Sequence, residues 1–167
     1  EGSVVDYGDC DDRLGQDRSR LGEAQEAWLE GSLAEGGVTW NLLGNPVVLA
    51  GVNAGKDSDA FYLDTWDGFP QARERLIAQL AGSSNPVVLT GDYHASFVLD
   101  VNGPSPSGEA SDPAAGDTVC PEFLVTAISS ILFSANYNDL NPQVRYFEAK
   151  HGYAVFTVTE DRFECEF

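Results

Sequence analysis

The fold is decided by the stretch Asn85-Pro86-Val87-Val88-Leu89-Thr90-Gly91-Asp92-Tyr93-His94-Ala95-Ser96-Phe97. Its apolar run, residues 87–89, is rich in β-branched side chains and follows a polar boundary, which predicts a strand buried on both faces. A buried helical segment is the alternative for so short a run. Asp92 and His94 follow a glycine that permits a tight turn. Ligands of open α/β sheets bind beyond the carboxyl ends of the strands, so this pair is a candidate site.

The flanking segments have the alternation of an α/β protein. Residues 71–81 carry leucine and isoleucine on one side and charged residues on the other, with Pro70 before them and Gly82 after, which predicts a helix. A second helix is predicted over 22–33, ending near Gly36 and Gly37. A helix, a buried strand and a polar turn in succession indicate the α/β class.

The remaining elements are predicted from alternation and from turn residues. Strands are expected at 2–6, at 40–50 with a bend at Gly44-Asn45-Pro46, at 98–101 and at 123–128, and a terminal hairpin at 144–147, 153–159 and 163–167. Loops are expected at 6–20, 52–60, 62–70 and 134–142. Glycine, proline, serine and acidic residues dominate a segment at about 102–117, which predicts a flexible loop.

Length and charge exclude several functions. The 167 residues fit a single domain, 1–167. Acidic side chains number 27 against 9 basic ones, a net charge of -18, so nucleic acid and anionic membranes are poor partners. The excess carboxylates either keep the chain in solution or offer ligands to hard cations. No apolar stretch is long enough to span a membrane.

The three cysteines, Cys10, Cys120 and Cys165, lack the close spacing of a zinc ribbon or a redox motif. If the chain is exported, one disulfide can form, and an odd thiol would then remain.

Seven short motifs follow one another along nearly the whole chain. They are Arg20-Leu21-Gly22-x-x-Gln25-x-x-Trp28-Leu29, Trp40-x-x-Leu43-Gly44, Asp64-x-Trp66-Asp67-Gly68-Phe69-Pro70-x-x-Arg73, Val88-Leu89-Thr90-Gly91-Asp92-x-His94-x-Ser96, Glu122-Phe123 with Ile128-Ser129-Ser130, Asn141-Pro142 and His151-Gly152-Tyr153. Together they resemble the C-terminal half of the PhoD-like alkaline phosphatases, which belong to the calcineurin-like metallophosphoesterases.

The resemblance implies an α/β fold that is part of a two-sheet metallophosphoesterase sandwich (αββα), with a C-terminal antiparallel hairpin. It implies a phosphate ester substrate, hydrolysis by a metal-activated water, and a secreted or periplasmic protein. The Gly-Asp-x-His motif resembles the last metal-binding motif of the superfamily, so Asp92 would ligate one metal and His94 the other. Iron with calcium is the expected pair, and zinc or manganese is the alternative.

The chain departs from the family pattern in two ways. The earlier motifs, a first Asp, a bridging Asp with a Tyr, and an Asn-His element, are not found here, so a second polypeptide or an N-terminal portion is expected to supply them. Gly44-Asn45-Pro46 lacks the imidazole of the Asn-His element and is interpreted as a structural bend. His151 stands where the family has an arginine, and is interpreted as a surface residue.

Asp67 is a weaker candidate for contact with substrate. The competing interpretation is that it caps the following helix, whose N-terminus favours an acidic residue. Tyr93 is expected to point away from the ligand pair. Two further functions stay open: a catalytically incomplete structural or interaction subunit that retains the fold, and a calcium-binding acidic module.

Overall fold

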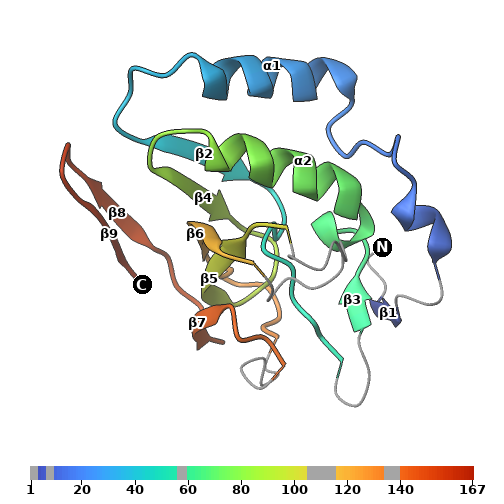
Figure 1. The fold of residues 1–167 in the computed structure, drawn as a ribbon. Coiled ribbons are helices and arrows are strands. Elements are labelled where there is room, and N and C mark those ends of the chain that lie inside the picture. Colours follow the sequence, from blue (N-terminus) through green and yellow to red (C-terminus); the bar gives the residue numbers. More distant parts are fainter. Residues whose placement is uncertain (1–3, 7–9, 56–59, 105–115, 134–139) are drawn as a thin grey trace.

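The computed structural model describes residues 4–6, 10–55, 60–104, 116–133 and 140–167. Its centre is a five-stranded sheet in the order β2-β4-β6-β5-β7 (Figure 1). The strands are β2 (Asn41–Asn45), β4 (Pro86–Thr90), β5 (Ser96–Asn102), β6 (Thr118–Leu124) and β7 (Val144–Glu148). The first three in this order are parallel, and β5 runs antiparallel to both of its neighbours. The sheet is therefore mixed, as expected of the predicted α/β class.

The smaller elements frame this sheet. Strand β1 (Val4–Asp6) pairs antiparallel with β3 (Ala60–Tyr62), and β8 (Val155–Val158) pairs antiparallel with β9 (Phe163–Glu166). Two 3-10 turns, η2 (Asp11–Leu14) and η3 (Trp66–Gly68), lie in the polar segments. In Figure 1 helix α1 runs along the top with α2 beneath it, and the β8–β9 hairpin stands at the left of the main sheet.

Both predicted helices are confirmed. Helix α2 (Pro70–Ala81) begins at the proline and buries Leu76, Ile77 and Leu80, the side that periodicity assigned to the core. Helix α1 (Glu23–Ala34) lies within a residue of its predicted bounds and buries Leu29. No helix among the described residues is long and apolar enough to cross a bilayer.

Strand β4 confirms the interpretation of the central stretch as a strand. Val87 and Val88 are 2% and 0% exposed, and they lie on opposite faces because side chains alternate along a strand. The strand lies between two parallel neighbours, β2 and β6, so that both of its edges are hydrogen-bonded as well.

Three strand predictions were wrong in extent or in partner. Residues 46–50 are irregular because the chain leaves the sheet at Asn45, although residues 48–50 are buried. Strand β6 covers residues 118–124, not 123–128. Residues 144–148 join the main sheet beside β5, so only β8 and β9 form the terminal hairpin. Residues 105–115 of the predicted flexible segment, and 134–139 of the predicted irregular one, lie outside the described residues.

The two faces of the sheet are covered differently. Strand β6 points Glu122 and Leu124 into the core, and both are fully buried. Phe123 points the other way and meets Phe156 and Phe163 of the hairpin, with ring centroids 5.8 and 5.6 Å away. On this second face Leu42 and Tyr146 remain 48% and 37% exposed. The described residues thus leave an apolar sheet face partly open to solvent.

A buried carboxylate, Glu122, ties the irregular segment after β2 to the sheet. It accepts hydrogen bonds from the backbone N–H of Leu49 at 2.9 Å and of Ala50 at 2.7 Å, and from the hydroxyl of Thr90. Burial raises the pKa of Glu122 despite these donors. Its folded state therefore holds the proton more tightly than the unfolded chain does.

This raised pKa predicts a pH dependence of stability. Below its ordinary pKa, Glu122 is protonated in both the folded and the unfolded chain and does not lower the free energy of unfolding. That free energy falls as pH rises from there through the raised pKa of the folded state. Glu122→Gln mimics the neutral acid at every pH. We therefore expect the stability of the variant, relative to that of the wild type, to increase as pH rises. Urea denaturation at a series of pH values measures this. Equal pH profiles for both proteins would contradict the burial argument.

A second variant separates charge from hydrogen bonding. Glu122→Leu leaves the amides of Leu49 and Ala50 without their acceptor, which is expected to destabilise the fold by about 1–3 kcal/mol per group. This loss should persist at all pH values.

All three cysteines are free thiols in the structure. Cys120 is buried, and burial raises its pKa to about 12. A thiol in that state is a small core side chain and not a nucleophile.

Candidate metal centre

The carboxyl end of β4 opens into a hollow of about 220 Å³. Its lining residues are Tyr62, Asp64, Thr65, Asp92, Tyr93, His94 and Phe133. Both members of the predicted pair thus line one hollow, at the position that the strand end indicated. Asp92 is exposed, whereas His94 is half-buried.

The backbone of this loop is in an unusual conformation. Asp92 has a φ of 73° and His94 a φ of 56°, both in the left-handed region that non-glycine residues rarely adopt. Each such residue costs on the order of 1–3 kcal/mol, and strain of this kind concentrates at functional sites. The intervening Tyr93 is buried, with its ring 5.6 Å from that of Tyr62 and 5.4 Å from that of Phe97. Packing of Tyr93 anchors the loop, and Tyr93 lines the hollow together with its two neighbours, contrary to the expectation that it points away from them.

The imidazole of His94 is held by a distant segment, residues 131–133. Its Nδ1 lies 2.6 Å from the carbonyl oxygen of Ile131, and its ring stacks on Phe133 with centroids 5.1 Å apart. The backbone N–H of Phe133 also donates to the carbonyl of His94 at 3.3 Å. A carbonyl only accepts, so Nδ1 must carry the hydrogen, and Nε2 of the neutral ring keeps its lone pair. This is the state in which histidine ligates a metal.

The donor types fit a metal, but the number of ligands is small. A carboxylate and an imidazole with a bare Nε2 suit a hard and a borderline cation respectively. The described residues contain no group of three or more His, Cys, Asp or Glu side chains arranged to hold a metal, although Asp64 lines the same hollow. Asp92 and His94 would therefore hold a metal only together with ligands from elsewhere.

Asp67 is not among the residues that line this hollow. It is 2% exposed, and its Oδ1 forms an ion pair with Nη1 of Arg73 at 2.6 Å. Thr65 caps the 3-10 turn by accepting from the backbone N–H of Asp67. The prediction that Asp67 caps the following helix was wrong, because its carboxylate binds a side chain of that helix instead of the helix's backbone.

His151 is exposed, as predicted for a surface residue, and its Nε2 donates to the carbonyl of Ser130 at 2.7 Å. Asn45 confirms the structural interpretation of the Gly-Asn-Pro bend. It accepts from the indole N–H of Trp66 at 3.1 Å and donates to the carbonyl of Val47.

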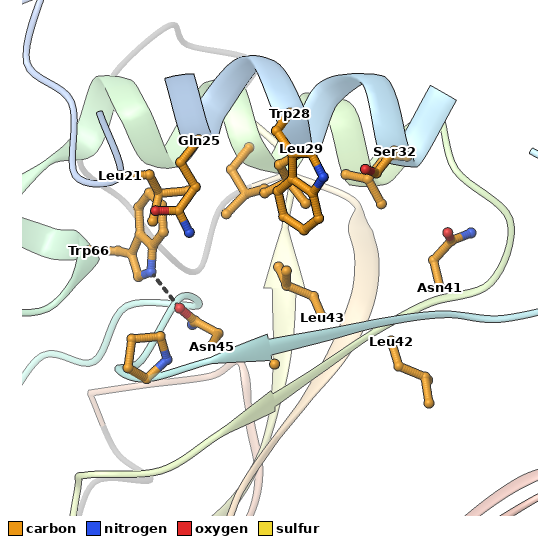
Figure 2. Close-up of a pocket in the computed structure, with 14 residues that line it drawn as sticks. Leu21, Gln25, Trp28, Leu29, Ser32, Asn41, Leu42, Leu43, Asn45 and Trp66 are labelled. Atoms are coloured by element: carbon orange, nitrogen blue, oxygen red, sulfur yellow. Dashed lines mark hydrogen bonds between the residues drawn. The ribbon is translucent and has the colours of Figure 1, made fainter. Parts of the chain in front are cut away.

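A larger hollow, of about 310 Å³, lies between α1 and β2 (Figure 2). Figure 2 shows the side chains of Trp28 and Leu29 pointing from α1 toward Leu43, whereas Leu42 points away from the helix. Among the residues that the structure describes, no Asp, Glu, His, Lys or Arg side chain lines this hollow. It therefore lacks the groups that acid–base or metal chemistry needs, and chemistry favours the smaller hollow as the site.

Comparison with known proteins identifies the family of the chain. The sequence profile of the PhoD-like phosphatases matches residues 4–167. The chain belongs to this family. The alkaline phosphatase D of Bacillus subtilis (strain 168) is 30% identical to it over 170 residues, which cover 94% of this chain. A solved structure of PhoD superposes on all of it, with a TM-score of 0.81 and 28% identity. The mixed α/β fold is therefore that of PhoD.

The match covers nearly all of this chain but only part of each relative. This chain spans 28% of the length of the Bacillus protein and 32% of the chain in the solved structure. A PhoD-like phosphatase of that length thus has more than two-thirds of its residues outside the region described here.

Residue patterns alone did not indicate the contacts that complete the hollow. Asp64 belongs to a motif that resembles the family, yet nothing local distinguishes it from any exposed acid in a turn. Ile131 acts through its backbone carbonyl, which leaves no trace in the side chain. Such contacts are made across long stretches of chain, and only the folded structure brings them together.

Proposed function

We propose that this chain is part of a phosphoric ester hydrolase of the PhoD type, with Asp92 and His94 as ligands to two different metal ions. The single observation that carries the proposal is the state of His94. Its Nδ1–H is committed to Ile131, and its Nε2 is left to ligate beside the Asp92 carboxylate in the same hollow.

The residues of the chain have limited roles in this mechanism. Asp92 and His94 are ligands and not general bases, because each would give its lone pair to a cation. When bound, a pair of metal ions lowers the pKa of a water for attack on phosphorus and offsets negative charge on the phosphoryl oxygens. Phe133 and Ile131 hold His94 in one orientation, so little ordering is needed as the metal binds. Iron with calcium is the proposed pair, with zinc or manganese as alternatives.

The remaining ligands are proposed to come from a second polypeptide or an N-terminal portion. The partly open apolar face around Leu42 and Tyr146 supports this, since parallel strands are ordinarily covered on both faces. The relatives have the additional length to supply such a layer. On family grounds we also propose that the enzyme works in the periplasm or outside the cell.

The test uses the protein that contains this chain together with the completing portion. Hydrolysis of p-nitrophenyl phosphate and of bis-p-nitrophenyl phosphate is measured before chelation, after it, and after return of single metals or pairs. We expect chelation to abolish hydrolysis and iron with calcium to restore it best. Hydrolysis that survives complete removal of metal would refute the mechanism. Absence of both metal and hydrolysis would favour the structural subunit.

A further inference from the structure

Arg20 lies next to the candidate metal centre without lining it. Its guanidinium sits over the ring of Phe69 at 5.3 Å and over Trp66 at 5.9 Å, and its Nη1 donates to the carbonyl of Thr65 at 3.3 Å. Thr65 is itself a lining residue of the hollow. The side chain is half-buried, so two aromatic rings and one hydrogen bond restrict a group that is normally mobile.

The charges around Arg20 come from the same hollow. Burial lowers the pKa of Arg20, and the negative charges of Asp64 and Asp92 act against that shift. These interactions act at a distance, because no direct ion pair joins Arg20 to either carboxylate. The guanidinium is therefore close enough to both carboxylates to feel their charge and is not neutralised by contact with them.

We propose that Arg20 binds the phosphoryl group of the substrate beside the Asp92 and His94 pair. This deepens the proposed function and rests on it. The substrate is an anion that must approach a chain of net charge -18, at a hollow lined by two carboxylates. A planar guanidinium can donate two parallel N–H bonds to phosphate oxygens, and a stacked one loses little entropy in doing so. Arg20 supplies the local positive charge and the geometry for recognising phosphate.

Arg18 provides a matched control. It also lies over Phe69, at 4.6 Å, and donates to a backbone carbonyl, that of Gly68 at 3.5 Å. The two arginines differ in the residue that they contact: Gly68 does not line the hollow, whereas Thr65, to which Arg20 donates, does. Loss of Arg18 therefore reproduces the loss of stacking and of charge without the proposed loss of phosphate contact.

The experiment measures equilibrium binding of inorganic phosphate to the metal-loaded, complete protein by calorimetry, with metal content determined in parallel. Arg20→Gln is expected to weaken phosphate binding roughly 10- to 100-fold, as for loss of hydrogen bonds to a charged group. Arg20→Lys, which keeps the charge but not the fork, should fall between the wild type and Arg20→Gln. Arg18→Gln should bind phosphate as the wild type does, and metal content should be unchanged in all variants.

Binding of phosphate needs no turnover, so this result is independent of whether esters are hydrolysed. If the wild type binds phosphate without hydrolysing esters, the proposed reaction fails, whereas Arg20 still stands as the phosphate-binding residue. Wild-type affinity in Arg20→Gln, equal losses in Arg18→Gln and Arg20→Gln, or loss of metal from Arg20→Gln would each overturn the proposal. Absence of phosphate binding by the loaded wild type would overturn it as well.

Discussion

Replacement of His94 by asparagine is expected to remove metal from the complete protein and, under the proposed mechanism, to lower kcat/KM for a phosphate ester by roughly 10²- to 10⁴-fold. The estimate follows from the several kcal/mol that a metal contributes to transition-state charge stabilisation. Asparagine is chosen because it tolerates the left-handed φ of 56° that this position requires, so the loop is disturbed little. Metal content by mass spectrometry and hydrolysis of a phosphate ester are the two measurements.

His151 offers a control of matched chemistry. Its ring also bonds to a backbone carbonyl, that of Ser130, which adjoins the Ile131 carbonyl bonded by His94. His151 does not line the hollow, so His151→Asn should leave metal content and kcat/KM near those of the wild type. Full metal occupancy in His94→Asn would show that His94 is not a ligand.

Replacement of Asp67 by leucine is expected to lower the free energy of unfolding by about 3–5 kcal/mol, the range for breaking one side of a buried ion pair. Arg73 is 4% exposed, so the variant leaves its guanidinium buried without that carboxylate. Trp66 is 2% exposed, and its fluorescence reports unfolding in urea.

A surface ion pair between α2 and α1 tests whether burial is the cause. Arg75 of α2 pairs with Glu26 at 3.2 Å, and their side chains are 42% and 26% exposed. Glu26→Leu removes the carboxylate partner of an α2 arginine just as Asp67→Leu does, yet a pair this accessible contributes only about 0–1 kcal/mol. Equal losses in the two variants would rule out the buried ion pair as the source of the effect.

Local sequence patterns were sufficient to predict the helices and the strand that lie nearest the candidate site. The helix bounds follow from Pro70 and from apolar spacing, which act within a few residues. The central strand follows from its β-branched run, and its end positions Asp92 and His94. The partners of the strands were harder to predict from the sequence, because residues 144–148 have the same alternation whether they pair with β5 or with β8.

The sequence by itself determined the α/β class, both helices, the buried strand, and the carboxylate and imidazole that follow it. These depend on short-range periodicity, on turn residues and on motifs that resemble a family. Only the tertiary structure decided which nitrogen of His94 is free, since the carbonyl that sets it lies 37 residues away. It likewise decided that Asp67 is a buried partner of Arg73 and that Arg20 bonds to Thr65 at the hollow that Asp92 and His94 line. Contacts of that kind depend on how the layers pack against one another, and the local pattern around each residue does not encode that packing.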